Sequence, residues 1–186
     1  MNRNLFKISP LEVAREVQKD PLIREARVIR KFPTTLQIEI HPRNPYVQIQ
    51  FFPNGPYYFT AEDQVVLSKE FNRNQNLLLI EAYESKKLKA ENGEELSLAG
   101  FREAVRLAKA FKNHPVVRSE TIERIRLDHL GNVALALVEG PELRFGRDPM
   151  RRFYTLDSLT PLLKEPDRHQ IIYIELQYQD LIVRKR

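Results

Sequence analysis

A strand–turn–strand pattern near the N-terminus constrains the fold more than any other part of the sequence. Residues 26–30 have the alternation of a strand with one clearer apolar face, and residues 36–40 alternate Leu and Ile with polar side chains. The connection is Phe32-Pro33-Thr34-Thr35, in which proline fixes φ and cannot extend a hydrogen-bond ladder. The pattern predicts a strand pair without any reactive side chain.

A helix is expected before this strand pair. Ser9 suits the N-cap, Pro10 suits the first helical position, and Glu12 stands three residues after the cap. The helix should end at Asp20-Pro21, because the residue before proline avoids the α region. With a strand over 5–8 and a short helical turn at 21–23, the order is β-α-α-β-β. This order predicts a small α+β unit of one sheet covered by helices.

The rest of the chain predicts a larger, mostly antiparallel sheet with two packed helices. The expected strands are 57–59, 65–67, 77–80, 122–127, 133–138, 142–145 and a long last strand, 170–178, with a kink at 179–180. The expected helices are 97–113 and 149–164, and Pro161 should distort the last turn of the second. We expect the boundary between the units at 52–76, which divides the chain into domains 1–70 and 71–186.

Composition excludes several classes of protein. The chain is 42% hydrophobic and 30% charged, as in a folded protein, and it has no Cys for disulfides, thiol catalysis or Cys-ligated zinc. The net charge of +5 is spread along the chain, with the densest patches at 24–31 and 184–186, so no nucleic-acid partner is expected. A nucleic-acid-binding protein is an alternative that rests on net charge alone. No apolar run is long enough for a membrane helix. Because the chain already opens inside a strand pattern, the lack of a membrane helix is only weak evidence for a soluble protein.

Nothing in the sequence predicts a catalytic residue, a metal site or a cofactor. The four histidines each lie near the end of an expected element or in a turn, and none stands four residues from another: His41, His114, His129 and His169. Six scattered glycines leave no loop that could cradle a phosphate.

The function that remains is binding through the shape of the surface and through backbone hydrogen bonds. A strand added last in a chain often lies at a sheet edge, where its free N–H and C=O groups can pair with another chain. The alternative is an edge that the charged ending, 184–186, protects.

Several motifs in series resemble the FtsQ/DivIB family of bitopic bacterial cell-division proteins. The POTRA domain of that family is similar to two segments of this chain, NLFKIS and PLIREARVIRKFPTTLQIEIHPRNPYV. Its β domain is similar to two later segments, TIERIRLDHLGNVALALVEGPELRFG and IIYIELQYQDLIVR. The resemblance covers nearly the whole chain in the right order. It departs from the family at His41-Pro42-Arg43, where Glu-Arg is common, and at Glu175 and Gln177, where Asp and Arg are usual. The loss of that arginine puts in doubt a charge pair with an acidic partner.

The resemblance implies a non-enzymatic assembly scaffold of the divisome. It places this chain outside the cytoplasmic membrane, in the periplasm at the division septum, attached by an N-terminal membrane helix absent from this chain. The implied partners are FtsB/DivIC-like and FtsL-like division proteins and other divisome components. The last strand would pair with a strand of the FtsB-like partner through Leu176, Gln177, Tyr178, Gln179, Asp180, Leu181, Ile182 and Val183. A weaker recruitment surface is expected at Arg27, Arg30 and Lys31.

A second function fits the first unit of the chain. A POTRA-type chaperone module of an outer-membrane assembly or secretion system would bind unfolded strands through residues 29–40. A membrane helix upstream of residue 1 in the full gene favours the division scaffold, and tandem POTRA repeats or a following barrel favour the chaperone.

Overall fold

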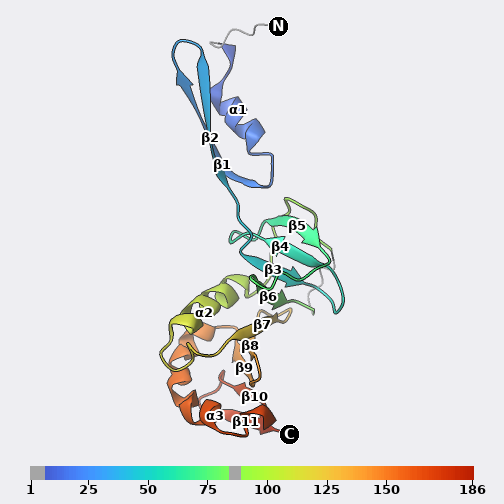
Figure 1. Ribbon diagram of the computed structural model, residues 1–186, viewed down its shortest axis with the longest axis vertical. Coiled ribbons are helices and arrows are strands. Elements are labelled where there is room, and N and C mark those ends of the chain that lie inside the picture. Colours follow the sequence, from blue (N-terminus) through green and yellow to red (C-terminus); the bar gives the residue numbers. More distant parts are fainter. Residues whose placement is uncertain (1–6, 84–88) are drawn as a thin grey trace.

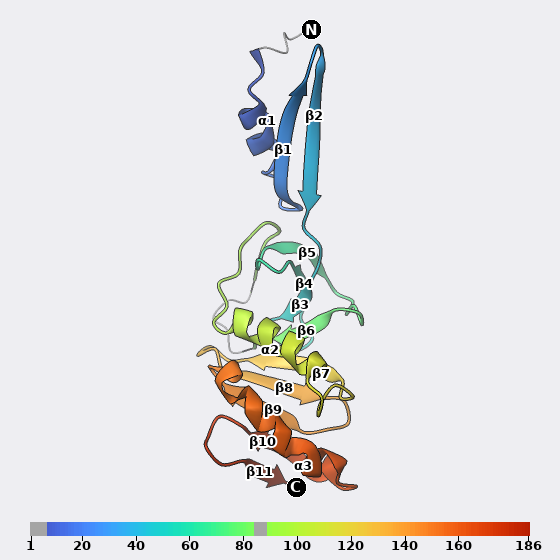
Figure 2. The ribbon, with the colours of Figure 1, turned by 90° about the vertical axis from the view of Figure 1, so that its left-hand side faces the viewer.

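The computed structural model describes residues 7–83 and 89–186 and has an α+β fold built from two units. One helix and a two-stranded sheet form the first unit, and a nine-stranded sheet with helices on one face forms the second. Figures 1 and 2 show an elongated molecule, with the first unit at one end and the C-terminus at the other. The N-terminal strand pair and the last strand therefore lie at opposite ends of the protein.

The first unit forms where the capping and strand patterns predict it. Helix α1 (Pro10–Val17) begins after Ser9, whose Oγ accepts a hydrogen bond from the Glu12 N–H at 3.4 Å. Strands β1 (Ile23–Lys31) and β2 (Thr35–Pro42) pair antiparallel across the proline turn, which confirms the strand pair. The core of this unit is small, because Ala14 and Ala26 are its buried apolar side chains among the described residues.

Two other expectations for the first unit have different outcomes. The short helical turn at 21–23 is not formed, because the Asp20 carboxylate accepts a hydrogen bond from the Leu22 N–H at 2.9 Å and β1 already begins at Ile23. An Asp side chain that bonds the backbone two residues later favours a turn over a helix. Of the expected strand over 5–8, residues 5 and 6 lie outside the described residues, and Lys7 and Ile8 are not in a strand.

The large sheet is mostly antiparallel, as expected. Its strands are β3 (Val47–Gln50), β4 (Tyr57–Thr60), β5 (Val66–Glu70), β6 (Leu78–Glu81), β7 (Ile122–Leu127), β8 (Val133–Leu137), β9 (Glu142–Gly146), β10 (Ile171–Glu175) and β11 (Ile182–Lys185). They lie in the order β11-β10-β9-β8-β7-β6-β3-β4-β5. Five of the eight strand pairs are antiparallel, and the pairs β3–β6, β6–β7 and β9–β10 are parallel. The β4–β5 hairpin and the β7–β9 meander are confirmed.

The chain changes from one sheet to the other earlier than the expected boundary. Strands β3, β4 and β5 all belong to the large sheet, although they lie within residues 47–70, before the end of the expected first domain. All four residues of β3 are buried, which requires cover on both faces of the strand, and β6 pairs with β3 in parallel. The change of sheet falls between Pro42 and Val47, and we propose to place the domain boundary there.

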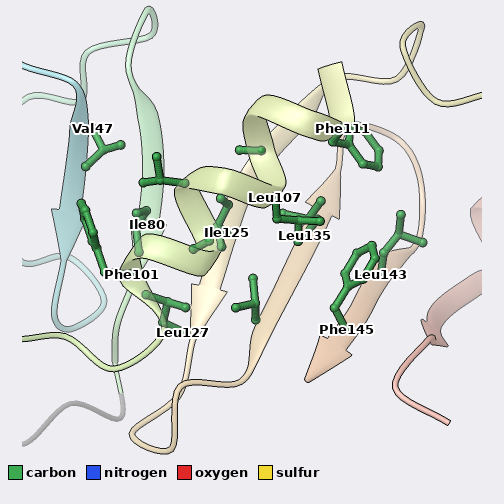
Figure 3. Packing of buried hydrophobic residues seen from close by; sticks show 14 of the residues in the cluster. Val47, Ile80, Phe101, Leu107, Phe111, Ile125, Leu127, Leu135, Leu143 and Phe145 are labelled. Carbon is green, nitrogen blue, oxygen red and sulfur yellow. The ribbon is translucent and has the colours of Figure 1, made fainter. Parts of the chain in front are cut away.

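Helices cover one face of the large sheet. Helix α2 (Phe101–Asn113) directs Phe101, Leu107 and Phe111 onto the large sheet. In Figure 3, Phe101 lies near Val47 of β3 and Ile80 of β6, and Leu107 lies near Leu135 of β8. Each of these fully buried side chains stabilises the fold by about 1.5–3 kcal/mol relative to an exposed one. The expected helix over 149–164 is a 3-10 helix, η2 (Pro149–Leu159), followed by a short α-helix, α3 (Thr160–Lys164), and a turn, η3 (Arg168–Gln170), leads into β10.

Two helix expectations need correction. Helix α2 begins at Phe101 rather than at residue 97, because Gly100 has a left-handed backbone with φ of 77° that interrupts the helix. Pro161 lies at the start of α3 instead of distorting a last turn, since proline is tolerated in the first helical turn. Across residues 7–83 and 89–186, no helix combines the length and the apolar character that spanning a membrane requires.

Candidate functional site

The C-terminal edge of the large sheet is built by two strands instead of one. The long last strand expected over 170–178 ends at Glu175, and the chain bends through 177–180. It then returns as β11, which pairs antiparallel with β10 and has no strand on its other side among the described residues. The reversal uses exposed polar residues, so it needs neither glycine nor proline. The edge of the sheet is therefore β11, at the end of the molecule away from the first unit.

The eight residues predicted to bind a partner lie in three different environments. Leu176 is fully buried in the core of the sheet, with 0% exposure. The four residues from 177 to 180 form the exposed connection, in which Tyr178 is 53% exposed. Leu181 is half-buried, and Ile182 and Val183 begin the edge strand. The structure thus brings only the last part of the predicted set to the free edge and adds Arg184 and Lys185 to it.

One backbone hydrogen bond shows which groups of β11 face outward. The Arg186 N–H donates to the Gln170 carbonyl at 2.9 Å, so residue 186 faces β10. Because successive residues of a strand direct their backbone groups to opposite sides, residues 184 and 182 also face β10. The N–H and C=O groups of Val183 and Lys185 consequently point away from the sheet. They form a short row of donors and acceptors that another strand can pair with.

The face of the sheet opposite the helices has a chain of charges beside this edge. The Arg144 guanidinium on β9 bonds Glu142 Oε1 at 2.7 Å and Glu175 Oε1 on β10 at 3.1 Å. It also stacks 3.7 Å from the ring centroid of Tyr173. Glu142 is bonded in turn by Arg126 of β7 at 2.9 Å. A hollow of about 330 Å³ lies along these strands and is lined by charged and polar side chains.

Electrostatics show how firmly this cluster is held. Burial alone would raise the pKa of Glu142, but hydrogen bonds from Arg144 and Arg126 outweigh burial and hold the pKa below its ordinary value. Burial likewise opposes the charged form of Arg144, and its two carboxylate partners raise the pKa of the guanidinium instead. Both groups are therefore charged at neutral pH, and the bond to Glu175 and the stacking on Tyr173 direct the Arg144 guanidinium toward β10.

Gln177 lies at the end of this cluster. Its amide Nε2 donates to Glu175 Oε2 at 2.8 Å. The sequence patterns do not show these charged residues as one cluster. Its signal was the period-2 spacing of Glu142 with Arg144 and of Tyr173 with Glu175, which places each pair on one face of a strand. The parallel pairing of β9 with β10, which joins the two pairs, could not be seen in the sequence.

The weaker recruitment surface is not one patch. Arg27 and Lys31 lie on the face of β1 opposite α1, where Arg27 is paired in register with Glu39. Arg30 lies on the other face, where its guanidinium donates to the Ile8 carbonyl. Because neighbouring residues of a strand alternate between faces, the three side chains cannot act on one ligand surface. We retain Arg27 and Lys31 as a proposed surface and assign Arg30 to holding the N-terminal segment.

No group of three or more His, Asp and Glu side chains among residues 7–83 and 89–186 is arranged to hold a metal ion. His114 lies 3.5 Å from the Asp157 carboxylate and packs edge-on against the ring of Phe153, which ties the end of α2 to η2. Among the described residues, the candidate binding features are therefore the outward backbone groups of β11 and the charged face of the sheet.

Comparisons with known proteins match this arrangement. Residues 1–43 match the family model of the FtsQ-type POTRA domain. Over 165 residues the chain is 26% identical to the cell division protein FtsQ of Syntrophotalea carbinolica, an alignment that covers 87% of this chain and 56% of that protein. The chain therefore spans about half the length of this relative.

The fold and the matched unit define a class of protein in which a POTRA domain is followed by a larger β domain. Within that class, the two findings confirm the resemblance to the FtsQ/DivIB family of cell-division proteins. The POTRA match ends at residue 43, where the chain passes from the first sheet to the second.

Proposed function

We propose that this chain is the extracytoplasmic part of a non-enzymatic divisome scaffold that binds FtsB/DivIC-like and FtsL-like partners. A membrane helix outside this chain would hold it at the septum, on the periplasmic side of the cytoplasmic membrane. The similarity to a cell division protein FtsQ and the FtsQ-type POTRA match support the general role.

The free edge of β11 is the observation that carries the proposed mechanism. Val183 and Lys185 offer outward-facing backbone groups with no neighbouring strand among the described residues, and a partner strand that bonds them would extend the large sheet by one strand. Main-chain pairing of this kind supplies affinity, and side chains beside the edge supply specificity. Ile182 is 49% exposed on the open face, so it can contact an apolar side chain of the added strand. Tyr178 and Leu181 flank the same edge.

Charge at the edge indicates the chemistry of the partner strand. The chain ends in Arg184-Lys185-Arg186, and Arg184 shares the open face with the Arg144 cluster through its register with Tyr173. An acidic residue of the partner opposite Arg184 would form a cross-strand pair. We therefore propose a partner strand in which apolar and acidic residues alternate. Its acidic residue would pair with Arg184, and this pair would replace the charge pair that the uncharged Gln177 cannot make.

A proline at Lys185 tests this mechanism. Lys185→Pro removes one outward N–H and leaves the bonds between β10 and β11, whereas the matched control Lys185→Ala keeps that N–H. Both variants lose the exposed ion pair of Lys185 with Glu165, which has an N···O distance of 3.3 Å and contributes little. We expect calorimetry with the FtsB/DivIC-like protein of the same genome to show at least about tenfold weaker binding for the proline variant only. Equal affinity of the two variants would remove β11 as the binding edge.

A second candidate function rests on the edge of the first unit. Strand β2 pairs with β1 on one side and with no described strand on the other, and Ile38 and Ile40 are 44% and 49% exposed on its face. A POTRA-type chaperone module would use this edge to bind unfolded strands. Binding of an unfolded outer-membrane barrel protein that survives Lys185→Pro and is lost in Ile38→Asp would favour this function over the scaffold.

A further inference from the structure

The two units of the molecule have little packing to hold them together. Among the described residues, the extensive contacts of α1, β1 and β2 are with one another, and those of β3 to β11 lie within the large sheet and its helices. Figure 2 shows one extended segment running from β2 into β3 between them. Units that share so small an interface are expected to move relative to each other unless specific contacts hold them.

Arg43 lies at this crossing and bonds to both sides of it. Its backbone N–H donates to the Leu22 carbonyl at 2.7 Å. Its Nη1 donates to the carbonyls of Pro21 and Ile23 at 3.1 and 2.7 Å. Its Nε donates to Asp63 Oδ2, in the β4–β5 turn of the large sheet, at 2.9 Å. A single planar guanidinium therefore joins the start of β1 to the second unit.

Burial makes this contact stronger than an ordinary surface ion pair. The side chains of Arg43 and Asp63 are 18% and 33% exposed. Asp63 Oδ1 is buried and has no hydrogen-bond partner among the described residues, so the guanidinium is the main compensation for that carboxylate. A charged pair held in this way is screened less by salt than an exposed pair.

Two features next to the pair limit other movements. Pro42 and Pro45 flank the crossing and fix their own φ angles, which leaves few rotatable bonds in the segment. Pro21 of the first unit packs against Gly93 of the second, where an added Cβ would lie 3.0 Å from the Pro21 Cβ. The prolines restrict rotation only at their own positions, so the freedom that remains in the crossing, within residues 43–46, permits a swing of the first unit. The Arg43–Asp63 contact opposes that swing.

We propose that Arg43 and Asp63 form an orientation lock that fixes the direction of the first unit relative to the large sheet. With the lock closed, the β1–β2 hairpin and the β11 edge are held at opposite ends of one rigid body, as in Figure 1. With the lock open, the hairpin swings about residues 43–46 while both units stay folded. Arg43 is a positioning residue in this proposal, which is independent of what binds at either end.

A neighbouring ion pair provides the matched control. Glu62, next to Asp63 in the chain, bonds Lys109 of α2 at 2.8 Å, and the two side chains are 57% and 54% exposed. Both partners belong to the second unit, so the pair does not cross between units. Glu62→Gln removes the same charge from the same turn as Asp63→Asn, and only Asp63→Asn breaks an ion pair that joins the two units.

Distance measurements between spin labels test the lock in the full chain. The protein has no Cys, so labels attach only at Thr34→Cys, at the tip of the hairpin, and at Ser158→Cys, on η2. We expect a narrow distance distribution for the labelled parent and for Glu62→Gln, and one at least about twofold wider for Asp63→Asn. Arg43→Lys should also widen it, because an ammonium group cannot bond two carbonyls and the carboxylate in the fork geometry of Arg.

Two results for the distance distribution would overturn the proposal. One is a distribution for Asp63→Asn as narrow as that of the parent. The other is equal widening in Glu62→Gln, which would assign the effect to the general charge of the turn. Circular dichroism and the melting temperature should match across the variants, and this match separates a free swing from loss of the fold. A widened distribution with a lost melting transition would likewise count against the lock.

Discussion

Removal of the Arg144 side chain should cost more stability than removal of either carboxylate that it bonds. In Arg144→Gln, Glu175 keeps only the neutral amide of Gln177 as a partner, although its side chain is 13% exposed. Glu142, 15% exposed, keeps Arg126 but loses its second cation. A largely buried charge left without compensation costs about 1–3 kcal/mol. The stacking on Tyr173 contributes about another 0.5–1 kcal/mol at a partly exposed site. Together the two contributions span about 1.5–4 kcal/mol, and we expect a loss in the middle of that range, about 2–3 kcal/mol.

The opposite deletion, Glu175→Gln, should be milder. Arg144 then keeps Glu142 at 2.7 Å and remains 36% exposed, so water solvates the rest of the guanidinium. We expect a loss of about 0.5–1 kcal/mol, as for other partly exposed pairs. The double variant should lose less than the sum of the two, because the carboxylate that Arg144→Gln leaves unpaired is gone.

Urea denaturation of these three variants, with Arg147→Gln as control, measures the difference. Arg147 is exposed and has no ion pair among the described residues, so its removal should change the free energy of unfolding by less than about 0.5 kcal/mol. A loss of 2–3 kcal/mol in Arg144→Gln corresponds to a melting temperature lower by about 4–12 °C for a chain of this size. If Glu175→Gln proves as damaging as Arg144→Gln, or the two losses add, the reasoning from unpaired carboxylates is refuted.

Three further predictions concern the same sheet. Leu176→Ala should lower the free energy of unfolding by about 2–5 kcal/mol in urea titrations and leave the partner affinity of the folded protein unchanged, because Leu176 is buried. Gly131→Ala should cost at least about 1–3 kcal/mol in thermal melts, since φ is +84° and the new Cβ would lie 3.1 Å from the Gly100 nitrogen. The lowered pKa of Glu142 contributes stability that is fully present above its unfolded pKa of about 4.5 and is lost as the pH falls through the folded pKa. Glu142→Gln should therefore flatten the acid limb of stability measured against pH.

Local patterns predicted the elements of the fold well. The two strands around Phe32-Pro33, the β7–β9 meander and the start of α1 depend on neighbouring residues, namely on period-2 alternation, proline and the Ser9 cap. The sheet to which a strand belongs depends on distant residues instead. β3 pairs in parallel with β6, and these strands are separated by the β4–β5 hairpin. The position of β3 in the sequence gave no sign of that pairing, and the chain changes sheet before the expected boundary at 52–76.

The candidate site was harder to predict than the fold. Alternation continues from residue 171 through 178, and the bend that ends β10 has no glycine or proline to mark it. The strand was therefore predicted to run on as one edge, which placed Leu176 at the binding surface instead of in the core. The Arg144–Glu175 bond joins residues 31 positions apart, and it exists only because β9 and β10 lie side by side. The alternation within one strand shows which face of the sheet each side chain lies on. Which side chains of other strands lie next to it depends on how the strands pair.

The cations of β11 oppose the pairing of this exposed edge with a second copy of itself. If two copies joined antiparallel through β11 in a register centred on Lys185, residues 184–186 of one copy would lie against the same cations of the other. Like charges directly opposite across strands are destabilising, so self-pairing is opposed in the region that remains open to an acidic strand. The same residues can thus both protect the edge and select its partner. Protection of the edge and binding of a partner, the two interpretations of the charged ending, are then one mechanism. It also predicts that high salt, which screens exposed charges, raises self-association measured by sedimentation and weakens binding of an acidic partner.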